Sequence, residues 1–77
     1  MKFFLVAYGR RHGRLLDMQE FREDERARAL EERFKREVKE RNRPDVEVVL
    51  LGAESREDLE RTHARYFKTL EEIAAST

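Results

Sequence analysis

Two apolar segments decide the fold, Phe3-Phe4-Leu5-Val6-Ala7-Tyr8 and Val46-Glu47-Val48-Val49-Leu50-Leu51. The chain around them is strongly polar, because 44% of its residues are charged. Successive side chains of a strand point to opposite faces, so a strand that is apolar at almost every position needs cover on both faces. The rest of the chain offers two helices, each with one apolar stripe. Two such helices can bury both faces of a small sheet only if they lie on opposite sides of it.

The other elements follow from breakers and from the spacing of apolar residues. Gly9 and Gly13 permit the positive φ of a tight reversal, so a hairpin loop is expected between them. Pro44 cannot continue a helix, and Gly52 closes the second apolar segment. The partly polar segment that follows the hairpin loop suits an edge strand. The expected strands are residues 2–8, 14–21 and 46–51, and the expected helices are residues 22–42 and 56–74.

This order of elements predicts a single α+β domain over residues 1–77, arranged β-β-α-β-α. A right-handed crossover through the first helix makes the third strand parallel to the second and antiparallel to the first. The strand order 2-1-3 places the most apolar strand in the centre of the three-stranded sheet, where burial of both faces is easiest.

Each helix shows one apolar stripe at steps of three and four residues, which is typical of a helix that packs on a core. The intervening charges, including the pairs Glu31-Lys35 and Glu32-Arg36, are expected on the solvent side. Ser55 is expected to cap the second helix. The first stripe consists of Ala27, Leu30, Phe34 and Val38, and the second of Leu59, His63, Tyr66, Leu70 and Ile73.

The composition excludes several classes of protein. The chain contains no cysteine, which excludes disulfides and thiolate metal sites. Its longest apolar runs are far shorter than the roughly 20 residues of a membrane span, so a cytoplasmic bacterial protein is expected. The 17 basic and 17 acidic residues give a formal net charge of zero. The high proportion of charged residues suggests a heat-adapted or high-GC source. The first 16 residues alone carry four basic residues and no acidic one.

The hairpin loop is the most suggestive local feature. Arg10, Arg11, His12 and Arg14 surround two glycines, and guanidinium groups bind phosphate oxygens bidentately. A basic hairpin tip of this kind can contact a nucleic-acid backbone, with Tyr8 nearby as a stacking surface. The alternative interpretation is a solvated turn that only adds charge to the surface.

No catalytic or metal site is expected, and no cofactor. His63 has no second metal ligand at i+3 or i+4, so a structural histidine is favoured. His12 has no identifiable nucleophile to activate. The helical carboxylates are expected in ion pairs, which gives no sign of a paired acid and base. We therefore expect a protein without enzymatic activity.

The two-faced strands suggest an interface. If both helices shared one face of the sheet, the other face would expose large apolar side chains, and a patch of that kind marks an interaction surface. A homodimer through this face or through the second helix is the first hypothesis, and contact of the hairpin loop with RNA or the ribosome is the second. The candidate interface residues are Phe4, Val6, Tyr8, Val49, Leu51 and Phe67.

Two segments carry a resemblance to known proteins. Residues 48–55, with the sequence VVLLGAES, run into residues 62–67, with the sequence THARYF. Together with a hairpin followed by a charged helix, they resemble short uncharacterised bacterial proteins. The resemblance covers nearly the whole chain but implies no activity and no functional residue.

Overall fold

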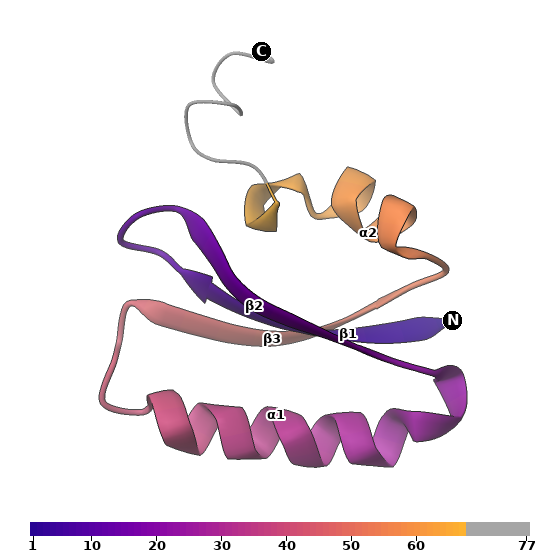
Figure 1. The fold of residues 1–77 in the computed structure, drawn as a ribbon, viewed down its shortest axis with the longest axis horizontal. Helices are drawn as coiled ribbons and strands as arrows, with labels where there is room; N and C mark the ends of the chain where they lie inside the picture. The colour runs from indigo at the N-terminus through magenta and orange to yellow at the C-terminus, as the bar shows by residue number, and fades with distance from the viewer. Residues whose placement is uncertain (68–77) are drawn as a thin grey trace.

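A computed structural model describes residues 1–67 (Figure 1). It confirms the predicted α+β fold with the element order β-β-α-β-α, to which two short 3-10 turns are added. The elements are β1 (Lys2–Gly9), β2 (Arg14–Phe21), η1 (Glu23–Glu25), α1 (Arg26–Glu40), β3 (Val46–Ala53), α2 (Arg56–Thr62) and η2 (Ala64–Tyr66).

The strands form one sheet in the order β2-β1-β3, as predicted. β1 is antiparallel to both neighbours, so β2 and β3 run parallel to each other. Opposite Val6 stand Met18 on β2 and Val49 on β3. A bulge interrupts the β1–β2 ladder between Ala7 and Tyr8. In the hairpin loop Gly13 has a φ of 60°, a conformation that side chains with a Cβ rarely adopt.

The two helices lie on opposite faces of the sheet, α1 below it and α2 above it in Figure 1. Each face therefore has its own apolar cluster, which explains why β1 is apolar on both faces. The cluster beneath α2 contains Phe4, Val6, Tyr8, Ala53, Leu59 and Tyr66. The smaller cluster beneath α1 contains Leu5, Phe21 and Ala29.

The predicted direction of the apolar stripe on α1 is wrong. Leu30, Phe34 and Val38 are 40%, 67% and 46% exposed, and they point away from the sheet. The side of the helix that faces the sheet is instead built from one small residue and four charged ones. It consists of Glu25, Ala29, Glu32, Arg36 and Glu40, all buried or half-buried.

Ion pairs hold this unusual packing together. Arg36 extends across the sheet to β2, where its Nη1 lies 2.9 Å from Oδ2 of Asp17. The buried carboxylate of Glu40 lies between two guanidinium groups, with Oε1 3.2 Å from Arg36 Nε and Oε2 3.3 Å from Arg43 Nη1. A buried carboxylate is tolerated only when it is paired in this way.

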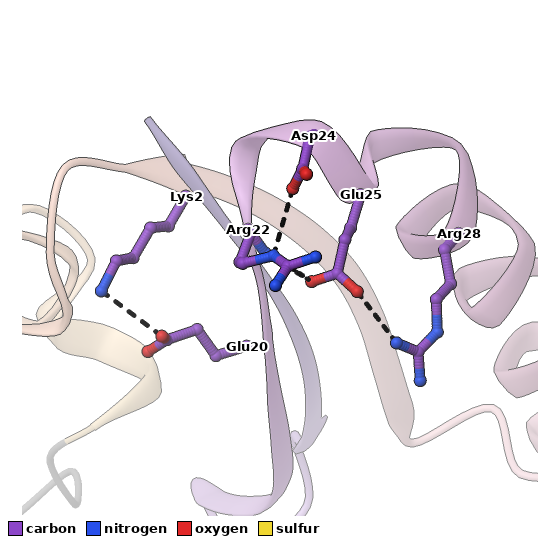
Figure 2. A network of polar contacts seen from close by, with 6 residues as sticks. All are labelled: Lys2, Glu20, Arg22, Asp24, Glu25 and Arg28. Carbon is purple, nitrogen blue, oxygen red and sulfur yellow. Dashed lines mark hydrogen bonds and ion pairs between the residues drawn. The ribbon is translucent and has the colours of Figure 1, made fainter.

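A second polar network stabilises the N-terminal end of α1 (Figure 2). The backbone N–H of Arg22 donates to Oε1 of Glu25 over 2.9 Å, and the N–H of Glu25 donates to the carbonyl oxygen of Arg22 over 3.0 Å. Arg28 donates to the second oxygen of the same carboxylate over 2.9 Å. Two orphan donors at the helix start are thereby satisfied. Figure 2 also shows Lys2 paired with Glu20 across the β1–β2 ladder.

The second helix is shorter than predicted. Ser55 caps it as expected, because its Oγ accepts the N–H of Asp58 over 3.1 Å. The helix then ends at Thr62, whose hydroxyl donates back to the carbonyl oxygen of Asp58, and His63 leaves the helical conformation with φ −126° and ψ 47°. The chain continues in η2 and not in one long helix. The rest of the predicted helix, residues 68–74, lies outside the described residues.

Candidate functional site

The four basic positions of the hairpin loop are all exposed, but they are not equivalent. The backbone N–H of Arg10 donates to the carbonyl oxygen of Asp45 over 2.8 Å, and its Nε lies 3.5 Å from Glu47 Oε1. Within the described part of the chain, Arg11, His12 and Arg14 form no ion pair. Arg10 is therefore tied to the fold, whereas its three neighbours remain available to an anion.

Glu47 is the centre of the densest side-chain cluster near this loop. Its carboxylate accepts hydrogen bonds from Arg65 Nη2, over 3.1 and 3.3 Å, and from the hydroxyl of Tyr66. The Arg65 guanidinium lies 4.7 Å from the centre of the Tyr66 ring, and that ring meets Tyr8 edge-on at 5.2 Å. Aromatic and cation–π contacts of this geometry stabilise a fold. Sequence reasoning missed the cluster, because its members come from three separate elements.

The contacts within this cluster stabilise the fold. Burial raises the pKa of the Tyr66 phenol above its ordinary value of 10.0, and the hydrogen bond to the Glu47 carboxylate adds to the effect. A phenol held in its protonated form donates to the carboxylate and does not act as a base at neutral pH. The oxygens of Glu47 are already occupied by Arg65, Tyr66 and Arg10. His63 lies beside the cluster, its ring centre 6.5 Å from that of Tyr66.

The candidate interface on the sheet face is not an open surface in this structure. Phe4, Val6 and Tyr8 are 0%, 0% and 5% exposed, because α2 and η2 cover them. That surface required both helices to share the other face, and they do not. Val49 and Leu51 are half-buried at the margin of the same cluster, together with Phe67. Of the predicted interface residues, these last three are half-buried, whereas the first three are buried.

The strand that carries Val49 and Leu51 has an outer edge that no strand of residues 1–67 pairs with. β3 lies at one side of the sheet, and its side chains from Val48 to Leu51 are all half-buried. The opposite edge, β2, presents exposed Arg14, Asp17 and Glu20. Charged side chains protect a strand edge against pairing with another chain, whereas an apolar edge invites it. β3 contains a single charged residue, Glu47, which the cluster above already pairs.

The outward side of α1 offers a second apolar surface. Its exposed stripe of Ala27, Leu30, Phe34 and Val38 runs along the helix, here called the outer stripe of α1. Beside it is a hollow of about 210 Å³. The sequence showed this stripe clearly, and only its direction was misjudged. Four residues line the hollow: Leu30, Arg33, Phe34 and Glu37.

Two further observations concern metal ligands and membrane-spanning helices. Within residues 1–67, no group of three or more histidine and carboxylate side chains is placed to hold a metal ion. No helix in the same range is long and apolar enough to cross a membrane. Comparison of the chain with protein-family models, with curated proteins and with solved structures gave no match.

Proposed function

We propose that this chain is a small non-enzymatic interaction protein of the cytoplasm that works as a homodimer. The observation that carries the proposal is the outer stripe of α1, with Phe34 67% exposed in the isolated chain. Fully burying a side chain of this size stabilises by about 1.5–3 kcal/mol, so covering several half-exposed ones favours association. A contiguous apolar surface rimmed by charges is typical of a binding site.

Analytical ultracentrifugation over micromolar concentrations tests the proposal. The wild-type chain is expected to sediment as a dimer, and Phe34→Gln is expected to shift the equilibrium toward monomer by at least about tenfold, which corresponds to 1.4 kcal/mol. Leu16→Gln is the matched control, since Leu16 is also exposed, at 43%, but lies on β2. A wild-type chain that stays monomeric throughout contradicts the proposal.

A second function, contact with RNA through the hairpin loop, is favoured by the exposed side chains of Arg11, His12 and Arg14. Their lack of ion-pair partners among residues 1–67 leaves their donors available to phosphate oxygens. Binding through so few phosphate contacts is expected to be weak and to fall steeply with salt.

Binding of a single-stranded RNA oligonucleotide at low and moderate salt tests this second function. Arg11→Glu/Arg14→Glu is expected to abolish binding while the circular dichroism spectrum is retained. Lys35→Glu/Lys39→Glu, which makes the same change in net charge on α1, is expected to leave binding nearly intact. Equal loss in both variants would mean that the loop is not the contact.

A further inference from the structure

We propose that two copies of this chain pair through their β3 strands, antiparallel about a two-fold axis, to form one six-stranded sheet with the two α1 helices side by side. This architecture rests on the proposed homodimer and names the surfaces that form it. Four features of residues 1–67 support it: the unpaired edge of β3, the position of α1 over the sheet, the hollow on α1 and the arrangement of charge around that hollow.

The outer edge of β3 has no partner strand in the part of the chain that the structure describes. β3 pairs with β1 on one side only, and within the described residues its only backbone hydrogen bond outside the sheet is from Val46 to Arg43 at the strand start. The outward-pointing N–H and C=O groups of the strand can therefore pair with a second strand. A copy of β3 satisfies them and covers the half-exposed side chains of Val48 to Leu51.

The position of α1 fits this arrangement. α1 packs against β1 and β3. Strands in a sheet lie ~4.8 Å apart, so two such helices, each centred between β1 and β3 of its own copy, would be separated by two strand spacings, ~10 Å. Helices pack against each other at ~8–10 Å. Pairing the strands thus brings the two helices into contact without further movement.

The side of α1 that would meet its copy can be identified. Glu37, Glu40 and Arg41 line one cavity together with Val46 and Val48 of β3. The other flank of the helix lies over the β2 side, where Lys35 and Arg36 line a cavity with Asp17 and Gln19. The flank that contains Glu37 therefore faces the outer edge of β3, and with it the hollow that Glu37 helps to line.

This hollow has the form of a helix-packing site. Leu30, Arg33, Phe34 and Glu37 stand at positions i, i+3, i+4 and i+7, and four residues in this arrangement make the hole that receives one side chain of a facing helix. In a two-fold dimer each α1 supplies both the hole and the side chain that fills the hole of its copy. Leu30 or Phe34 is the apolar side chain available for that purpose.

The charges around the hollow are self-complementary. Arg33 precedes Glu37 by one turn, and within the chain Arg33 Nε lies 2.8 Å from Glu37 Oε1. The two α1 helices are antiparallel in the proposed dimer, and a two-fold axis at the level of residue 35 places Arg33 of each copy beside Glu37 of the other. Opposite charges placed across an interface in this way favour association and fix its register.

The register of the strands follows from symmetry. In antiparallel strands, the side chains of directly opposite residues point to the same face of the sheet. A two-fold axis perpendicular to the sheet must therefore lie at a residue that faces its own copy, and not between two successive residues. An axis at Val49, near the middle of β3, pairs Val49 with its own copy and Val48 with Leu50. Glu47 then faces Leu51 and not a second carboxylate, which avoids a like-charge pair.

Single cysteines test the strand pairing without interference, because the chain has none of its own. Val49→Cys is expected to form a covalent dimer under mild oxidation, since opposed Cβ atoms of paired strands lie within reach of a disulfide. Leu16→Cys, on the edge of β2, is the matched control and is expected to stay monomeric on a denaturing gel. A Val49→Cys chain that dimerises in solution but is not cross-linked contradicts the β3 pairing.

Charge reversal tests the helix contact. Arg33→Glu and Glu37→Arg are each expected to weaken the dimer at least tenfold, and the double variant is expected to return it to within about threefold of wild type. Lys35→Glu, on the other flank of α1, is expected to leave the dimer unchanged.

The two sets of results separate the two proposals. A wild-type chain that is monomeric at every concentration overturns the homodimer itself. A stable wild-type dimer that ignores the charge reversals at Arg33 and Glu37 and is not cross-linked at Val49 overturns only this architecture. It would leave pairing through the outer stripe of α1 alone as the alternative.

Discussion

Ala29 and Phe34 lie on opposite sides of α1, the smaller residue completely buried against the sheet and the larger one 67% exposed. The helix approaches the sheet through the small side chain, which packs in one cluster with Leu5 and Phe21. Its apolar stripe points away from the sheet and remains exposed. This orientation of α1 is the basis of the proposed homodimer and of the helix contact in its proposed architecture.

The orientation can be tested with two matched substitutions in the same helix. Ala29→Leu is expected to destabilise the chain by about 1–3 kcal/mol, because a close-packed site has no room for three more carbons. Ala27→Leu, on the exposed side, is expected to change the free energy of unfolding by less than about 0.5 kcal/mol. Urea denaturation followed by circular dichroism measures both, and the reverse order would mean that the outer stripe faces the sheet.

The architecture was predictable from the sequence because its strongest signals are local. β1 and β3 are apolar at nearly every position, the hairpin glycines mark the reversal, and the crossover rule then fixes the strand directions. The strand order also placed Val46–Leu51 at an edge of the sheet. These features depend on short stretches of chain, which is why they survive in the structure.

The direction of α1 was not predictable in the same way. Its periodicity shows one apolar stripe, but a helix with charged residues on its other side can still turn that side inward when each charge finds a partner. Arg36 forms an ion pair with Asp17, which is 19 residues away in the sequence. Glu40 is paired by Arg36 and Arg43. Pairing between elements is not encoded in local spacing, so the outward direction of the stripe could not be predicted, although the stripe itself could.

Tyr66 is expected to give the chain an alkaline limit of stability. Its folded pKa lies above the ordinary value of 10.0, chiefly because of burial and then because of the Glu47 carboxylate. The folded state therefore favours the protonated phenol. The stabilisation is fully present below pH 10 and is lost as the pH rises through the folded pKa.

Tyr66→Phe tests this expectation. Near neutral pH the variant is expected to lose about 1 kcal/mol, because the hydrogen bond to Glu47 is removed. Its free energy of unfolding is then expected to fall less steeply than that of the wild type between pH 9 and pH 11, because phenylalanine has no phenol whose pKa differs between the folded and unfolded states. Parallel pH profiles for the two proteins would show that the phenol does not titrate with folding.

Glu25 is expected to affect the folding stability of the chain at acidic pH. The backbone N–H of Arg22 lowers the pKa of this carboxyl below its ordinary value of 4.5, burial opposes the shift, and Arg28 supports it. The contribution to stability is thus present above pH 4.5 and is lost as the pH falls through the folded pKa. Glu25→Gln is expected to flatten the acid limb of the stability profile, and carboxyl titration by NMR should show the depressed pKa directly.

Ser55 provides the last test, because α2 is short and depends on its cap. The Ser55 hydroxyl accepts the N–H of Asp58, and α2 in turn buries Leu59 completely in the cluster on that face. Ser55→Ala is expected to cost about 0.5–2 kcal/mol, whereas Ser55→Asp keeps an acceptor at the helix start and is expected to cost far less. Thermal unfolding of the three proteins distinguishes the cap from a packing effect: equal losses in both variants would mean that the side chain acts by its size and not by its hydrogen bond.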